Sequence, residues 1–265
     1  MTATVKRVLR RIEAGIRKLL YSPAAWLSKQ VLSSQKKLSR LGTEYGGWTV
    51  VQESSLHNSW AILCGAGEDI SFDLALQTVY KCNVLIADPT PQAVAHFALV
   101  SSSACSGKRV AINNSTSEFY DLANVDFSMV HYTPVAVWTK KTTIKFWLPL
   151  ERSNVSHSIT NLQNTDEYIE VAAEPLSHML KKFAVSEEAV QLVKLDIEGA
   201  EVDVIDWMCD NSFLPKQVLV EFDEMTFPDR TTLHRVKHAN NRLKNAGYEL
   251  AYFDGRSNCT YLRMK

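Results

Sequence analysis

The sequence has few cysteines and no long apolar run. Its five cysteines lie far apart, and none has CxxC spacing or a neighbouring histidine–cysteine cluster: Cys64, Cys82, Cys105, Cys209 and Cys259. This pattern favours neither a zinc site nor a disulfide framework, so we expect a reducing, cytoplasmic environment. No stretch approaches the roughly 18 apolar residues of a membrane-spanning helix, and the N-terminal residues do not follow the signal-peptide pattern.

Net charge is also absent, because 29 Lys and Arg balance 29 Asp and Glu. The balance conceals an asymmetry. Residues 1–42 carry ten basic residues and one acidic residue, so the rest of the chain is acidic. Residues 4–20 place apolar side chains along one face of a helix and arginines mainly on the others. We therefore predict a basic amphipathic helical arm, residues 1–42, followed by one domain, residues 43–265.

The arm has two interpretations. A basic amphipathic helix can lie on an anionic membrane surface, which predicts peripheral contact at the inner face of the membrane. Alternatively, the helix packs on the domain or on a partner subunit with its basic face in solvent. Nucleic acid is not expected as a partner, because the remaining residues are acidic and contain no recognition motif.

Glycine is scarce, and two of the ten glycines stand together where an apolar strand ends. The strand at residues 60–64 runs into Gly65-Ala66-Gly67, and a helix follows. Glycines at such a turn let the backbone approach a ligand closely. The third glycine of the dinucleotide fingerprint is missing, and Glu68 and Asp69 would repel a pyrophosphate. NAD or a nucleotide sugar is therefore disfavoured, and a ligand with a cationic part fits better.

Acidic residues follow three further predicted strands. Asp88 comes after the strand at residues 82–87, where an acid commonly binds a ribose diol or caps a helix. Asp196, Glu198 and Glu201 follow an apolar run that begins at Leu192. Since the carboxyl ends of parallel strands form the ligand-binding edge of an α/β sheet, these acids are candidates for function. Glu221 ends a later strand and joins Glu198 and Glu201 as a candidate for substrate or divalent-metal binding.

Two pairs of segments alternate as strands do. Residues 127–138 and 142–148 are predicted to pair around a turn, and the last two strands are predicted to form an antiparallel hairpin. Between them, His157 lies in a polar loop and is a candidate general base, although a lone loop histidine is also typical of a solvated surface. The order of elements predicts a doubly wound α/β fold with an antiparallel pair at one edge.

The residues after the central strand carry a family resemblance. Leu192-Val-Lys-Leu-Asp-Ile-Glu-Gly-Ala-Glu201 resembles the signature of the FkbM family of S-adenosylmethionine-dependent methyltransferases. The resemblance covers about residues 58–264. Its other motifs are Gly65-Ala-Gly67, Asp88-Pro-Thr-Pro91, Val155-Ser-His-Ser-Ile159, Val218-Leu-Val-Glu221 and Gly247-Tyr248. Two motifs depart from the usual family pattern: Leu63-Cys64 precede Gly65 where an Asp-x pair is common, and Asp88-Pro-Thr90 replaces a Glu-Pro-Asn type sequence.

The resemblance implies a Rossmann-like, seven-stranded class I methyltransferase sheet that binds S-adenosylmethionine. It implies O-methylation of a hydroxyl on a sugar, polysaccharide, glycolipid or secondary metabolite. Gly65, Ala66 and Gly67 would lie near the methionine part of the cofactor, Asp88 near the ribose, and Ala136 and Val137 near the adenine.

The catalytic candidates are His157 and Asp196. Methyl transfer from an activated donor requires alignment and a base for the hydroxyl proton, and these two residues are candidates for that base. A non-enzymatic alternative is a catalytically degenerate, methyltransferase-like scaffold that docks other proteins on a membrane through its basic arm.

Overall fold

A seven-stranded mixed sheet forms the centre of the computed structural model, which describes residues 15, 21–32, 36–106, 109–113, 115, 117–147, 166–226 and 228–264. The strand order is β11-β12-β10-β9-β3-β4-β5. The strands are β3 (Trp60–Cys64), β4 (Asn83–Ala87), β5 (Val130–Thr133), β9 (Val190–Leu195), β10 (Gln217–Glu221), β11 (Tyr248–Phe253) and β12 (Asn258–Arg263). β3, β4, β5, β9 and β10 run parallel, and β12 lies antiparallel between β10 and β11. The predicted α/β class and seven-stranded sheet are confirmed.

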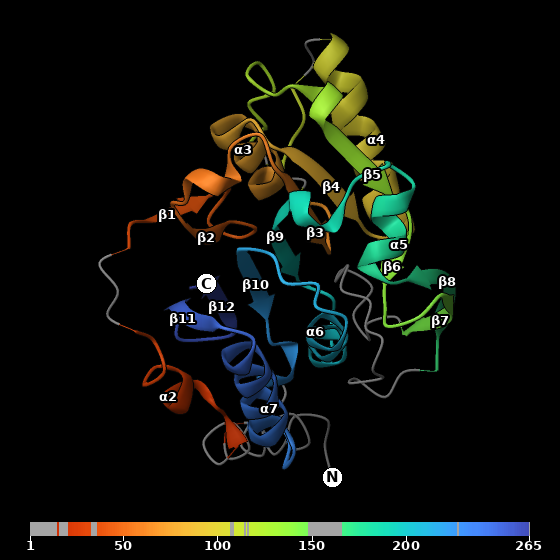
Figure 1. Ribbon diagram of the computed structural model, residues 1–265. Helices are drawn as coiled ribbons and strands as arrows, with labels where there is room; N and C mark the ends of the chain where they lie inside the picture. Colours follow the sequence, from red (N-terminus) through yellow and green to blue (C-terminus); the bar gives the residue numbers. More distant parts are fainter. Residues whose placement is uncertain are drawn as a thin grey trace.

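Helices cover both faces of this sheet (Figure 1). They are α3 (Ser71–Tyr80), α4 (Pro91–Ser106), α5 (Leu176–Lys181), α6 (Glu201–Asp210) and α7 (Thr232–Asn245), with short 3-10 helices at Ser54–Leu56, Phe127–Met129, Glu187–Ala189 and Asp223–Met225. Successive strand residues point to opposite faces, so Ile62 packs with α5, α6 and α7, whereas Leu63 packs with α3 and α4. This double burial explains why the central parallel strands β3, β4 and β10 are mostly apolar.

A second, smaller sheet lies beside the first, and it corrects one prediction. Its strands are β6 (Ala136–Val137), β7 (Thr142–Trp147) and β8 (Tyr168–Glu174), in the order β6-β8-β7. The predicted pairing of residues 127–138 with 142–148 is wrong, because β7 and β6 both pair with β8. Alternation identifies a strand with one buried face, but it does not identify the partner strand.

The segment before the sheet is packed against the domain rather than separate from it. α2 (Ala24–Leu27) buries Leu27 in the core that also contains α7. β1 (Leu38–Leu41) pairs antiparallel with β2 (Trp48–Val51). Residues 38–41 are therefore a strand and not part of a helical arm, and the predicted boundary at residue 42 falls inside this hairpin. Most of residues 1–20 lie outside the described residues.

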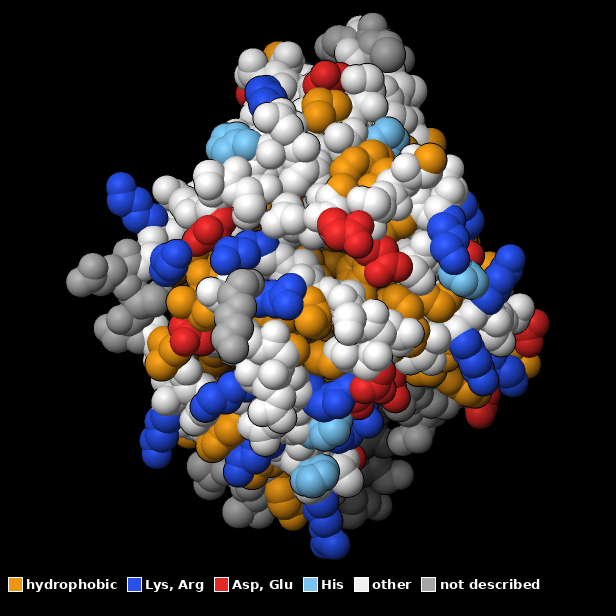
Figure 2. Space-filling model, viewed as in Figure 1, with side chains coloured by type: hydrophobic (Ala, Val, Ile, Leu, Met, Phe, Trp, Pro, Cys, Tyr) orange, Lys and Arg blue, Asp and Glu red, His pale blue; other side chains and the backbone are white. Residues whose placement is uncertain are grey.

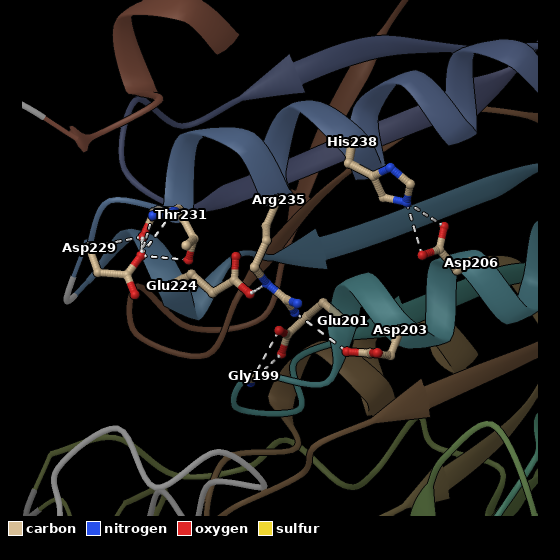
Figure 3. Close-up of polar contacts among 10 residues, drawn as sticks. Gly199, Glu201, Asp203, Asp206, Glu224, Asp229, Thr231, Arg235 and His238 are labelled. Carbon is tan, nitrogen blue, oxygen red and sulfur yellow. Dashed lines mark hydrogen bonds and ion pairs between the residues drawn. The ribbon is translucent and has the colours of Figure 1, made fainter.

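Ion pairs connect α6 and α7 (Figure 3). Arg235 on α7 contacts Glu224 and Asp203, and His238 lies 2.9 Å from Asp206. α7 contains no acidic residue, and basic side chains are frequent on the corresponding part of the surface in Figure 2. Within the described ranges, no helix is both long and apolar enough to cross a bilayer.

Candidate functional site

A cleft of about 610 Å³ opens at the carboxyl edge of the parallel strands. This volume is usual for a small-molecule site, and the edge is where open α/β sheets bind ligands. Most of the predicted site residues line this one cleft: Gly65, Ala66, Gly67, Asp88, Ala136, Val137, Asp196, Glu198 and Glu221. Glu201 is buried and does not line it. His157 lies outside the described residues, so its predicted role stays a prediction.

The turn after β3 presents bare backbone to the cleft. Gly65 has a φ of +84°, and a side chain there would place its Cβ 1.8 Å from the carbonyl oxygen of Asp196. Its amide donates to the carbonyl of Ala87 across 3.0 Å. Only glycine therefore fits between the ends of β4 and β9. Beside Gly67, whose φ is +52°, the space is open.

Asp88 holds this turn in place. One carboxylate oxygen accepts from the amides of Ala66 and Gly67, at 2.9 and 3.1 Å. The other accepts from the amide and hydroxyl of Thr90, at 2.8 and 2.7 Å. A carboxylate offers about four acceptor positions, so groups of the chain already use them all. A ribose hydroxyl at Asp88 would have to replace one of these bonds.

An apolar wall lies next to Asp88. β6 follows β5 and contributes Ala136 and Val137, both buried. Phe146 from β7 lines the same part of the cleft. The small second sheet thus supplies a surface suited to a flat apolar ring system.

Lys194 connects the glycine turn to Asp196. Residues two apart on a strand share a face, which places both side chains at the end of β9 on the side of α3. The buried Nζ of Lys194 lies 2.6 Å from the carbonyl oxygen of Gly65 and 3.2 Å from Oδ2 of Asp196. It also lies 5.4 Å from the ring centroid of Trp48.

Charges around Lys194 keep its ammonium protonated. Burial alone would lower the pKa of Lys194, but Asp196, Asp73 and Glu221 outweigh burial and raise it. Asp73 on α3 is 1% exposed, and its two carboxylate oxygens have no hydrogen-bond partner among the described residues. Burial raises the pKa of Asp73 to about 6, and the Lys194 charge opposes that rise.

Glu201 shapes the loop that carries Asp196. Its side chain turns back from the start of α6 and accepts from the amides of Ile197, at 3.1 Å, and Gly199, at 3.0 Å (Figure 3). Glu198, between these two, has a φ of +52°. A left-handed conformation at a non-glycine residue needs such support. Glu201 does not line the cleft itself, but it holds the loop whose residues Asp196 and Glu198 do.

The end of β10 adds two more acids. Glu221 accepts from the hydroxyl of Ser257 at 3.0 Å, and burial together with Asp196 raises the pKa of Glu221 to about 8. Burial and the neighbouring Glu201 raise the pKa of Asp223 as well. Across the described part of the chain, no group of three or more His, Cys, Asp or Glu side chains is arranged to hold a metal ion.

Several cleft residues were missed by sequence reasoning: Arg40, Tyr45, Trp48, Lys194, Asp223 and Arg256. Lys194 had a usable signal, because a lysine inside a buried strand needs a partner and Asp196 lies on the same face. Tyr45 and Arg256 had none, since only the tertiary fold brings the β1–β2 loop and the β11–β12 turn to this edge.

Comparison with known families gives one direct match. The model of the methyltransferase FkbM domain matches residues 64–250, more than half of the chain. The chain belongs to the FkbM methyltransferase family. The resemblance seen in the sequence is thereby confirmed. β1, β2 and β12 lie outside the residues matched by the FkbM model.

Similarity to solved structures is remote. A mutant of MtNAS is 10% identical over 78% of this chain and 53% of its own, with a TM-score of 0.37; this chain thus spans about half of its length. A fibrillarin pre-rRNA processing protein of Methanococcus jannaschii is 8% identical over 86% and 83% of the two chains (TM-score 0.38). TYW2 of M. jannaschii, in complex with AdoMet, is 12% identical over 88% and 90% (TM-score 0.33). No curated protein sequence matches the chain.

Proposed function

We propose that this FkbM-family chain binds S-adenosylmethionine in the cleft and methylates a hydroxyl of a sugar, glycan, glycolipid or secondary metabolite. One structural observation supports the proposal in addition to family membership. The bare glycine turn and the Asp196 carboxylate meet in one cleft, and the buried Lys194 bonds to both. A donor-binding backbone and a base are thus held at a fixed separation, which transfer between two bound molecules requires.

The residues present fit the donor. The turn at Gly65–Gly67 leaves room for the methionine part, and the wall at Ala136 and Val137 suits the adenine. S-adenosylmethionine, when bound, supplies a methyl group on a positively charged sulfur. Asp196 and Glu198 line the same cleft and favour a positive charge there.

Asp196 is the proposed base for the acceptor hydroxyl. Its side chain is 29% exposed, so an acceptor hydroxyl in the cleft can reach it. Lys194 holds one of its oxygens, which fixes the carboxylate relative to the turn. Glu201 fixes the loop that follows. His157 stays a second proposed base.

Titration calorimetry tests the proposal. S-adenosylhomocysteine, the demethylated product of the donor, should release heat with a single site per chain, and NAD should release none. Heat with NAD would instead indicate a dinucleotide enzyme. Heat with neither compound would contradict the proposal and favour the scaffold interpretation.

A further inference from the structure

One side of the cleft is built by residues outside the range that the FkbM family model matches. β1 contributes Arg40, the β1–β2 loop contributes Tyr45, and the β11–β12 turn contributes Asp254, Arg256 and Ser257. Figure 1 places β1, β2, β11 and β12 on the same side of the molecule. The donor-side residues Gly65 and Asp88 lie within the matched range. This outer side therefore lies outside the matched range, whereas the glycine turn and Asp88 lie inside it.

Hydrogen bonds anchor the outer side firmly to the sheet. Buried Gln217 on β10 exchanges two hydrogen bonds of 2.9 Å with the backbone of Val51. Buried Thr260 on β12 donates to the carbonyl of Thr49 at 2.6 Å. At the loop itself, the Thr43 hydroxyl donates to Asp69 at 2.6 Å. A Cβ at Gly46 would lie 2.5 Å from the same carboxyl group, so the loop is close-packed on the start of α3.

Tyr45 presents an exposed ring on this anchored loop. The residue lines the cleft and is 79% exposed, the highest value among the large hydrophobic residues described as exposed. Asp196 and Glu221 line the same cleft, so a ligand packed on the Tyr45 ring lies near these acids. An exposed aromatic ring on a rigid support gives a ligand ring a flat surface to pack on at little entropic cost.

Arg256 presents an available positive charge on the opposite turn. Asp254, the nearest acid in sequence, is occupied, because it accepts from the amides of Arg256, Ser257 and Asn258 at 2.7, 3.0 and 3.1 Å. Within the described ranges the Arg256 guanidinium has no hydrogen-bond or ion-pair partner, and the residue is exposed. A guanidinium of this kind pairs well with a carboxylate or a phosphate.

The floor of the cleft has the opposite charge. Its acidic residues are Asp196, Glu198, Glu221 and Asp223, of which Glu221 and Asp223 have raised pKa values and contribute less negative charge near neutral pH. The Lys194 ammonium is already paired with Asp196. An anionic group is repelled by this floor and attracted by Arg256. The charge pattern therefore orients an acceptor, with its hydroxyl inward and its anionic group outward.

We propose that the acceptor is a hydroxylated ring compound with a carboxylate or phosphate group, its ring packed on Tyr45 and its anionic group bound by Arg256. The inference rests on the proposed function, because it assigns the acceptor of that reaction. It makes Tyr45 and Arg256 the residues that determine acceptor specificity.

Saturation-transfer NMR on the protein saturated with S-adenosylhomocysteine tests this inference. Three probes share one hydroxylated ring: neutral methyl glucoside, methyl glucuronide with a carboxylate, and glucose 6-phosphate with a phosphate. At least one anionic probe should bind about tenfold more tightly than the neutral one, since a hydrogen bond to a charged group has that effect. Comparison of the two anionic probes identifies the preferred group. Equal binding of all three, or binding of none, would overturn the inference.

Variants separate the two contacts. Arg256→Ala should remove the preference for the anionic probe, and Tyr45→Ala should weaken all probes that bind. Arg230→Ala and Tyr168→Ala, at exposed residues that do not line the cleft, are the matched controls and should change neither. A preference that survives in Arg256→Ala contradicts the inference. All four variants should bind S-adenosylhomocysteine as the parent does. If the parent binds S-adenosylhomocysteine but none of the three probes, the proposed acceptor class is refuted and the proposed donor site is not.

Discussion

Among single residues, Lys194 makes the contacts that connect the parts of the cleft. A buried ammonium is unfavourable unless it is paired. Here it contacts the Gly65 carbonyl, Asp196 and the Trp48 ring, and Asp73 adds a buried negative charge nearby. The pairing fixes the glycine turn and the proposed base relative to each other. Stability and site geometry therefore depend on the same side chain.

Lys194→Met should lower the free energy of unfolding by about 3 kcal/mol, because it leaves Asp73 and the inner oxygen of Asp196 buried without a countercharge. Adding Asp73→Asn should recover part of that stability. Urea denaturation of the parent, the single variant and the double variant measures both effects. A single variant as stable as the parent would show that the ion pair does not stabilise the fold.

At the scale of elements, loops rather than strands determine the chemistry at the carboxyl edge. The loop after β9 depends on Glu201, and the turn after β3 depends on Asp88. Each carboxylate accepts from backbone amides that the strands leave without partners. Glu201 and Asp223 lie together in the interior. Burial raises the pKa of both, Glu201 adds to the rise at Asp223, and the hydrogen bond with Asp223 opposes the rise at Glu201.

Stability should therefore fall as pH rises. Burial raises the pKa of Glu201 from its ordinary value of 4.5 to about 7, so the folded chain holds a proton that the unfolded chain has lost. This contribution is complete below about pH 4.5 and is lost as pH rises through about 7. Glu201→Gln cannot lose that proton. The unfolding free energy of the parent relative to this variant should fall by on the order of 2 kcal/mol between pH 5 and 8. A difference that is independent of pH would refute the raised pKa of Glu201.

The sequence predicts elements better than it predicts their partners. Apolar runs that end in Gly65, Asp88, Asp196 and Glu221 identify parallel strands and their functional edge, because burial on both faces leaves a clear signature. β7 and β8 are separated in the sequence by residues 148–167, and no local pattern specifies that the two strands pair. β1 has only four residues and none of them is buried, so its pairing depends on β2 rather than on its own sequence.

In the whole molecule, residues from early and late in the sequence, from Arg40 to Asn258, line the same cleft. Gly65–Gly67, Asp88 and Asp196 lie within the matched range, in motifs that follow strand ends, which is why their position at the cleft could be predicted. Tyr45 and Arg256 are separated by most of the sequence and line the same cleft only because β2 packs on β10 and β12. No local spacing reports such a contact.

The basic N-terminal residues lead to a separate prediction about membranes. We propose that residues 1–20, with Lys6, Arg7, Arg10, Arg11, Arg17 and Lys18, bind anionic lipid. A deletion should end at residue 20 and not at 42, because Leu27 and β1 are packed on the domain. The shortened chain should keep its melting temperature and lose sedimentation with phosphatidylserine vesicles. Equal sedimentation of both chains, measured beside neutral vesicles, would contradict the proposal.

We propose that the glycine turn and Asp196 form the two sides of one methyl-donor site. A crystal structure with S-adenosylhomocysteine tests it most directly. We predict the homocysteine part against Gly65–Gly67, the adenine against Val137, and the sulfur facing Asp196. A ligand bound away from this cleft, or in it without contact to the turn, would contradict the account.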